Sequence, residues 1–144
     1  MSYFAGLGKA VAAAIAQNRI GSPVCLRAFF QLSADHGRLL QTMGEALAAA
    51  SQWFSSPPAR VFALGGIAAG EITAIVEYAG GQTALVCVGV LRNAPPLSNL
   101  LLIGNRGTLR FEDAPEIGEP GPANRPLLSA FEKSLAAQAP IEVR

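Results

Sequence analysis

The sequence predicts an α+β fold, a two-layer sandwich with helices on one face of a mostly antiparallel, open sheet. Residues 71–78 alternate between apolar and polar side chains, and Gly80-Gly81 links them to a second β-branched run, residues 83–91, which is typical of a hairpin. Residues 99–103 and 108–111 form a second such pair around a Gly-Asn-Arg-Gly turn. Helical patterns precede and follow these strands, and helices that share one face of the sheet supply the second layer.

The first half of the chain predicts two helices and a strand. Residues 7–18 are rich in Ala and carry one apolar stripe, which predicts a helix that ends at a left-handed Gly21. Residues 24–32 alternate in polarity, so we expect a strand there. Residues 39–54 predict a second helix, which Pro57 prevents from continuing. The inner side of this helix is expected to carry five apolar residues: Leu40, Met43, Leu47, Ala50 and Phe54.

The second half predicts one short strand, the two hairpins and a last helix. Residues 60–64 form the short strand, which leads through a Gly-rich turn into the first hairpin. Residues 114–126 are rich in Pro, Gly and Glu and predict an irregular surface segment. Residues 127–138 predict a helix that ends before Pro140. Its inward side is expected to carry Leu127, Leu128, Phe131 and Leu135. No linker composition divides the chain, so residues 1–144 are predicted to form one domain.

The composition predicts that the open face of the sheet is covered. Half of the residues are hydrophobic and only 15% are charged, so solvent alone is an unfavourable neighbour for a whole sheet face. A second copy packed face to face would cover it, and we therefore predict a homodimer. The predicted dimer face consists of residues from two strands: Cys25, Arg27, Phe29, Glu71, Thr73, Ile75 and Glu77.

Charge, hydropathy and cysteine content limit the other partners. A net charge of +1 gives no reason to expect nucleic-acid binding. The longest apolar run, residues 84–91, is far shorter than the roughly 20 residues of a membrane span, so no membrane partner is expected. Lys9 lies in the N-terminal stretch and no cleavage signature follows it, so no signal peptide is predicted. Cys25 and Cys87 lie in apolar strands, which favours buried free thiols in a cytoplasmic protein.

Several segments, taken in order, carry a family resemblance. Residues 12–23 (AAAIAQNRIGSP) are a helix that ends in an Ile-Gly-x-Pro turn, and residues 37–54 (GRLLQTMGEALAAASQWF) are a helix that opens with a glycine. The two hairpins with their glycine turns follow, and residues 128–143 add a closing helix and strand. This series, over nearly the whole chain, resembles the C-terminal domain of the glucose-fructose oxidoreductase, inositol dehydrogenase and MocA family. The resemblance implies the same α+β fold.

The chain departs from this family in the residues that carry its chemistry. Family members begin with a Rossmann domain for the dinucleotide, but no G-x-G-x-x-G motif follows a strand here, and the Glu-Lys-Pro segment with the family's catalytic lysine is missing. The family's active-site helix offers an aspartate, a histidine four residues later and a further acidic residue. Alignment on Gly37 and Gly44 places these on Thr42, Ala46 and Ala49. The resemblance therefore implies no catalytic residue and no cofactor on this chain, and NAD(P) only where a separate Rossmann-domain subunit supplies it.

Five residues are candidates for binding a small polar ligand: Arg27, His36, Arg38, Thr42 and Arg92. Arg27 lies in the middle of a strand, on the face away from the helices. It can bind an anion there, or it can pair across a dimer with Glu71 or Glu77.

His36 is the only histidine and has only Cys25 as a nearby soft ligand, so no metal site is predicted. Ser33 or Asp35 as a helix N-cap, beside a solvated His36, is the simpler interpretation. A hydrolase arrangement around Asp35 and His36 lacks a G-x-S-x-G elbow.

Three functions remain open at this point. The first is a non-catalytic, homodimeric domain that binds a small ligand or serves in assembly. The second is the small subunit of a split NAD(P)-dependent oxidoreductase, which a Rossmann-domain chain completes; the residues at Thr42 and Ala46 weigh against it, because such an enzyme still needs its base. The third is part of a longer enzyme, because Met1 stands just where the second domain of the family begins.

Overall fold

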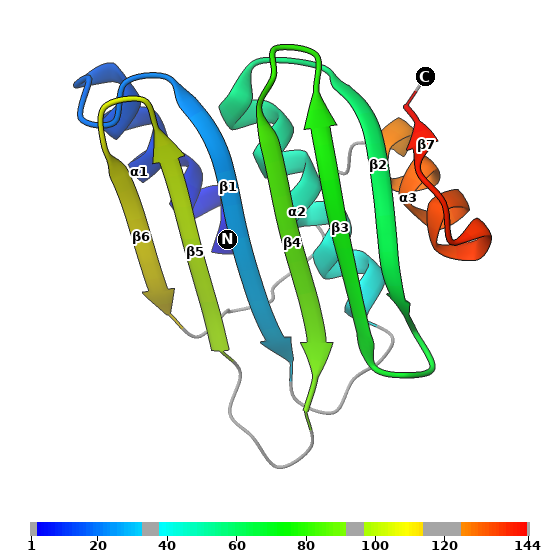
Figure 1. The fold of residues 1–144 in the computed structure, drawn as a ribbon. Helices are drawn as coiled ribbons and strands as arrows, with labels where there is room; N and C mark the ends of the chain where they lie inside the picture. Colours follow the sequence, from blue (N-terminus) through cyan, green and yellow to red (C-terminus); the bar gives the residue numbers. More distant parts are fainter. Residues whose placement is uncertain (1–2, 33–37, 92–96, 114–124, 144) are drawn as a thin grey trace.

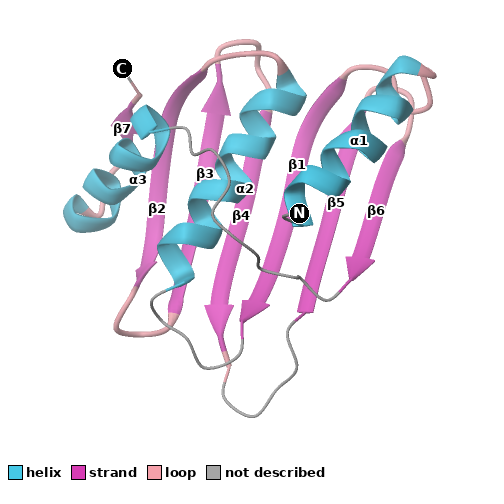
Figure 2. Ribbon diagram, turned by 180° about the vertical axis from the view of Figure 1, so that it is seen from behind, coloured by secondary structure: helices cyan, strands magenta, loops and turns pink. Residues whose placement is uncertain are grey.

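The computed structural model of the chain describes residues 3–32, 38–91, 97–113 and 125–143. In this part of the chain, three helices lie on one face of a seven-stranded sheet (Figure 1). In chain order the elements are α1 (Tyr3–Ala16), β1 (Pro23–Leu32), α2 (Leu39–Phe54), β2 (Pro58–Gly66), β3 (Glu71–Tyr78), β4 (Thr83–Val90), β5 (Leu97–Gly104), β6 (Thr108–Asp113), α3 (Arg125–Ala137) and β7 (Ile141–Glu142). Figure 2 shows all three helices from behind, so the predicted α+β fold class is confirmed.

The strands are arranged in the order β6-β5-β1-β4-β3-β2-β7. Both predicted hairpins are present, because β3 pairs with β4 and β5 pairs with β6 in antiparallel register. They are not neighbours in the sheet, however. β1 lies between them, antiparallel to β5 and parallel to β4. The sheet is therefore mostly antiparallel, as predicted, with one parallel contact at its centre.

The turn between β3 and β4 is wider than the predicted two-glycine connector. The Tyr78 amide donates a hydrogen bond to the carbonyl of Gln82 at 2.9 Å, so that residues 79–81 form the loop inside this bond. Gly81 has a φ of +91°, a left-handed conformation that glycine adopts without a steric cost. The strand ends are therefore closed by a longer loop than the glycine pair alone indicates.

Helix α1 ends earlier than predicted, at Ala16, and Asn18 rather than Gly21 is the first left-handed residue after it, with a φ of +58°. The segment that follows is held against the β5–β6 turn. The Ser22 amide donates to Asn105 Oδ1 at 3.0 Å, and the Arg106 amide donates to the carbonyl of Ile20 at 2.9 Å. The two glycine-containing turns that suggested the family resemblance therefore contact each other.

Helix α2 has the predicted bounds, Leu39–Phe54, and packs on the centre of the sheet (Figure 2). Leu39, rather than Leu40, is fully buried at its first turn. Arg38 occupies the N-cap position without a side-chain capping bond; Ser33 and Asp35, the predicted caps, lie outside the described residues. The helix ends at Ser55, whose φ of +52° is left-handed. None of the three described helices is long and apolar enough to cross a membrane.

Helix α3 covers the β2 edge of the sheet, and it begins at Arg125, two residues before the predicted start. Most of the predicted irregular segment, residues 114–124, lies outside the described part of the chain. Ser134 is fully buried in this helix. Its hydroxyl accepts a hydrogen bond from the Ala63 amide at 2.8 Å and donates one to the carbonyl of Ala139 at 2.5 Å. One side chain thus ties α3 to β2 and to the segment before β7.

Tyr78 gives the core a pH-dependent stability. Its ring contacts Phe54 edge to face, with centroids 4.9 Å apart, and its hydroxyl lies 3.3 Å from Ser51 Oγ. Burial raises the pKa of Tyr78 from 10.0 to about 12, and the hydrogen bond with Ser51 opposes this rise only in part. The unfolded chain therefore releases the phenol proton first, so the contribution of Tyr78 to stability is complete below pH 10 and is lost between pH 10 and about 12.

We expect the thermal unfolding temperature of the native chain to fall more steeply over this pH range than that of a Tyr78→Phe chain. Circular dichroism melts of both chains across the range measure the difference. Parallel curves for the two chains would contradict the raised pKa of Tyr78.

Candidate functional site

The face of the sheet opposite the helices has no helix of the described chain over it (Figures 1 and 2). Along each strand, alternate side chains point into the core or onto this face. We call it the open face, and its residues on the six long strands are Cys25, Arg27, Phe29, Gln31, Arg60, Phe62, Leu64, Gly66, Glu71, Thr73, Ile75, Glu77, Thr83, Leu85, Cys87, Gly89, Leu97, Asn99, Leu101, Ile103, Thr108, Arg110 and Glu112. On the short edge strand β7, Glu142 lies beside Arg60 on the same face. All seven residues of the predicted dimer face lie on it.

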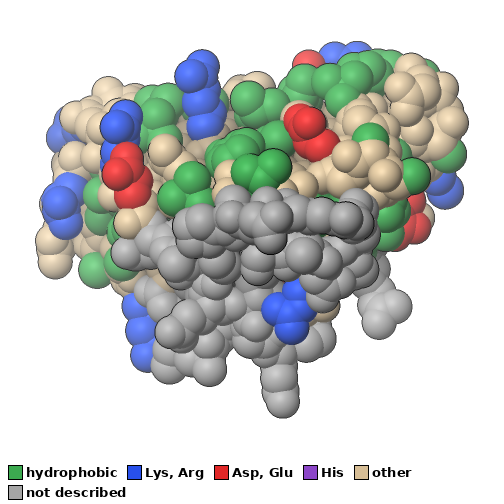
Figure 3. Space-filling model, turned by 90° about the horizontal axis from the view of Figure 1, so that it is seen from below, with side chains coloured by type: hydrophobic (Ala, Val, Ile, Leu, Met, Phe, Trp, Pro, Cys, Tyr) green, Lys and Arg blue, Asp and Glu red, His purple; other side chains and the backbone are tan. Residues whose placement is uncertain are grey.

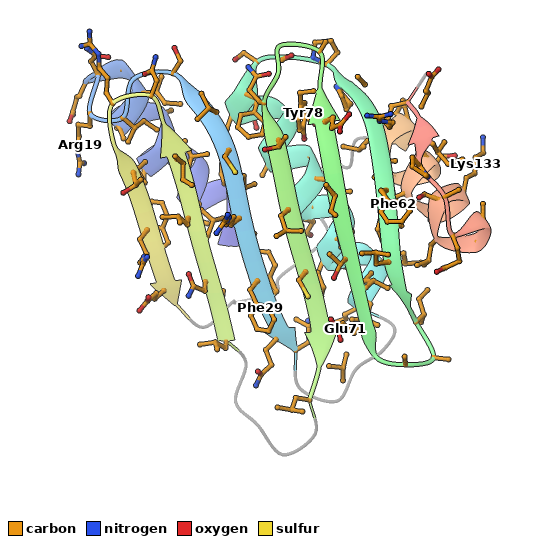
Figure 4. The ribbon with its side chains drawn as sticks, viewed as in Figure 1. Arg19, Phe29, Phe62, Glu71, Tyr78 and Lys133 are labelled. Carbon is orange, nitrogen blue, oxygen red and sulfur yellow. The ribbon has the colours of Figure 1, made fainter. Side chains whose placement is uncertain are left out.

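Large apolar side chains are exposed on the open face. Phe29, Ile75 and Leu85 have exposed fractions of 42, 38 and 40%. The strand register places Leu85 between Arg27 and Ile75 in one row across the sheet, and Cys87 next to Phe29 in the neighbouring row. Figure 4 shows Phe29 on this face of β1. In the end-on view of Figure 3, hydrophobic side chains are interspersed with charged ones above the grey segments.

The charged residues of the open face divide into paired and unpaired groups. Arg60 donates to Glu77 Oε2 from Nε at 3.0 Å, and an Arg110 nitrogen lies 3.9 Å from Glu112 Oε1. Arg27 makes no ion pair with any described residue. Glu77 is thus already paired within the same chain, which leaves Glu71 as the better of the two predicted partners for Arg27.

Both cysteines are free and lie on the open face, where they are half-buried rather than buried as predicted. The Cys87 thiol lies 3.7 Å from Glu71 Oε1. Burial raises the pKa of Cys87, the negative charge of Glu71 adds to the rise, and a hydrogen bond with Thr73 opposes it. The thiol form therefore predominates at neutral pH, and Cys87 lacks the low pKa of a reactive nucleophile.

A shallow depression of about 320 Å³ lies on the β6–β5–β1–β4 part of the open face. Its lining residues are Arg27, Ala28, Phe29, Leu85, Cys87, Asn99, Leu101 and Arg110. Two guanidinium groups over an apolar floor can hold an anionic group or a carboxylate of a partner. Among the predicted ligand-binding residues that the structure describes, which are Arg27, Arg38 and Thr42, only Arg27 contributes to this depression.

The positions that the family resemblance aligned with catalytic residues lie on the other side of the sheet. Thr42 and Ala46 are 2% and 1% exposed in α2, and Ala49 is also buried. The Thr42 hydroxyl oxygen has no hydrogen-bond partner among the described residues. The structure thus does not bring Thr42 together with Arg27. Arg38 is the N-cap of the same helix, whereas His36 and Arg92 lie outside the described residues.

Two features of these sites were not predicted from the sequence. The first is the central row of the open face, in which Arg27 lies together with Phe62, Leu85 and Leu101. The alternation of side chains along their strands could have predicted that these three residues lie on this face. Glu45 is a buried carboxylate in α2, only 8% exposed. An acidic residue within the apolar segment MGEALAAA could have predicted this buried position. In the described part of the chain, no cluster of His, Cys, Asp and Glu can hold a metal ion.

The sequence matches no protein-family model and no curated protein. Solved structures do match. Myo-inositol 2-dehydrogenase from Lactobacillus plantarum has a TM-score of 0.75 at 10% identity, over 95% of this chain and 61% of that chain. Scyllo-inositol dehydrogenase from Lactobacillus casei, solved with NAD(H) and scyllo-inositol, has a TM-score of 0.73 at 12% identity, over 94% and 61%. Myo-inositol dehydrogenase from Corynebacterium glutamicum has a TM-score of 0.69 at 14% identity, over 98% of this chain and 61% of that chain.

This chain spans about three fifths of the length of these dehydrogenases. At identities of 10 to 14%, the likeness is one of fold. The resemblance predicted from the sequence is confirmed at that level. This chain has the fold of the C-terminal domain of the glucose-fructose oxidoreductase, inositol dehydrogenase and MocA family.

Proposed function

We propose that this chain is a non-catalytic domain that forms a homodimer through its open face and serves as an assembly or small-ligand-binding module. The observation that carries this proposal is the open face itself. Phe29, Ile75 and Leu85 are adjacent on it and each is about two fifths exposed. Removing this apolar surface from water favours association, and an isologous contact covers the same face on both copies.

The residues on the helix side support the absence of catalysis. Proton abstraction from a substrate hydroxyl needs a base within hydrogen-bond reach. Neither Thr42 nor Ala46 is a base at neutral pH, and both are buried in the core. The dehydrogenases with this fold include one solved with NAD(H), but they are longer than this chain. We propose that this chain alone binds no NAD(P). The free Cys25 and Cys87 suit the reducing conditions of the cytoplasm, where we place it.

The second candidate is the small subunit of a split oxidoreductase. The two fifths of the dehydrogenase length without a counterpart in this chain favour it, because a separate Rossmann-domain chain can supply that part. The buried Thr42 and Ala46 weigh against it for the reason given above.

Native mass spectrometry of the chain, captured at low salt from the cells that produce it, tests the proposal. A homodimer is the expected result, with or without a small-molecule adduct. A stoichiometric complex with a dinucleotide-binding chain would establish the second candidate instead. A monomer without adduct or partner would overturn both.

A further inference from the structure

The central strands of the open face, β1, β4 and β3, carry one cation and one anion that have no oppositely charged partner within the described chain. Seven charged residues of the described chain project from this face. Four of them form the Arg60–Glu77 and Arg110–Glu112 pairs, and Glu142 lies on the short edge strand β7, beside Arg60. Arg27 on β1 and Glu71 on β3 remain. Strand spacing puts their backbones roughly 16 Å apart, too far for an ion pair within one subunit. Burying either charge without a partner is costly, so the occupant of this face has to offer both an anion and a cation.

A second copy of the chain offers both. We propose that Arg27 of each copy pairs with Glu71 of the other, and that the two-fold axis of the dimer therefore passes over Cys87. This inference rests on the proposed homodimer and adds the register in which the two faces meet.

The position of the axis follows from the strand register. On β4, Arg27 is level with Leu85, and Glu71 is level with Gly89. β1 and β3 flank β4 on its two sides. The midpoint between Arg27 and Glu71 is therefore the residue halfway between Leu85 and Gly89, which is Cys87. A two-fold axis that exchanges the two charges has to pass through this midpoint.

This axis also centres the interface on the exposed apolar surface. Phe29 is the register neighbour of Cys87 on β1, and Leu85 and Ile75 are adjacent to it on β4 and β3. They occupy the middle of the contact, where interfaces are most apolar. The strands of the two sheets then cross at roughly 70°, nearer the orthogonal than the aligned class of sheet packing.

The proposed register predicts that Cys87 can be crosslinked between the two copies and that Cys25 cannot, so crosslinking tests the register. The Cys87 thiols of the two copies face each other across the axis. The Cys25 thiols lie on the far side of Arg27 from the axis, and the same strand spacing separates them by roughly 25 Å. A short bis-maleimide, in which each thiolate adds to one maleimide double bond, joins only thiols that lie close together.

The experiment uses the full chain in two single-cysteine forms, Cys25→Ser and Cys87→Ser, at mildly alkaline pH because burial raises the pKa of Cys87. We expect the Cys25→Ser chain to become mostly covalent dimer on a denaturing gel and the Cys87→Ser chain to remain uncrosslinked. Native mass spectrometry establishes beforehand that both forms are dimeric. A dimer in which Cys87 does not crosslink, or in which Cys25 crosslinks equally well, overturns the register and leaves the proposed homodimer standing.

A charge exchange tests the ion pair independently. Arg27→Glu is expected to weaken self-association by about tenfold or more, since it places two carboxylates together. Arg27→Glu with Glu71→Arg is expected to restore association to within about threefold of the native chain. Arg19→Glu, off the open face, is the control for net charge and should leave association unchanged. Failure of the double variant to recover overturns the pairing. A native chain that is monomeric throughout overturns the pairing and the proposed homodimer together.

Discussion

An Ile75→Asp chain is expected to be monomeric, or to aggregate, at concentrations at which the native chain is a dimer. Ile75 lies in the central row of the open face, next to Leu85. In the proposed dimer an aspartate here is buried without a partner, at a cost of at least about 3 kcal/mol. This corresponds to a more than hundredfold weaker dimer. Size-exclusion chromatography with light scattering measures the change.

Ile67→Asp is the matched control for this variant. Ile67 lies in the turn between β2 and β3 and is 37% exposed, against 38% for Ile75. The two substitutions therefore add the same charge at sites of equal exposure, and only one of them lies on the open face. An Ile75→Asp chain that keeps the native oligomeric state would show that the open face is not the interface.

The combined Thr42→Asp and Ala46→His substitution introduces the residues that the family resemblance implies at these positions, yet it is expected to produce no hydride transfer. No G-x-G-x-x-G motif follows a strand in the sequence, and the two positions are 2% and 1% exposed. A buried, unpartnered carboxylate is expected to lower the free energy of unfolding by about 3 kcal/mol or more. Absorbance of the reduced nicotinamide, with inositols and sugars as substrates, tests the activity, and urea denaturation tests the stability.

Gln41→Asp serves as the control for the stability part of this prediction. Gln41 is half-buried in the first turn of α2, where the helix dipole favours a carboxylate. Its substitution should change the free energy of unfolding by about 0.5 kcal/mol or less. Activity of the doubly substituted chain with added nicotinamide cofactor would overturn the prediction that hydride transfer requires a nucleotide-binding domain in addition to these residues.

The sequence predicted the faces of the strands well because alternation is a local property. Cys25, Phe29 and Ile75 were assigned to the open face from period-two patterns alone, and all three lie there. The half-buried state of Cys25 was not predicted. The sequence of an apolar strand with one exposed face resembles that of a strand buried on both faces. Only the position of the helices shows which face is covered.

The position of β1 between the two hairpins could not be predicted, because it is not a local property of the sequence. Turn chemistry joins β3 to β4 and β5 to β6, because each pair is close in sequence. Nothing local in residues 23–32 indicates that they separate the two hairpins. For the same reason, the sequence could not show that Glu77 is paired and that Glu71 has no cationic partner among the described residues. Arg60 approaches Glu77 only when β2 and β3 pair in the observed register.

The central position of β1 also has a consequence for how the chain reaches its native state. During synthesis β1 is complete long before its neighbours, because Cys25 pairs with Thr83 on one side and with Ile103 on the other, and both are made much later. Until both arrive, an apolar strand with two unpaired edges remains exposed, and such strands associate with other chains. Contacts so distant in sequence also slow folding. We therefore expect refolding yield to fall with protein concentration, with the central strand as the origin of the loss.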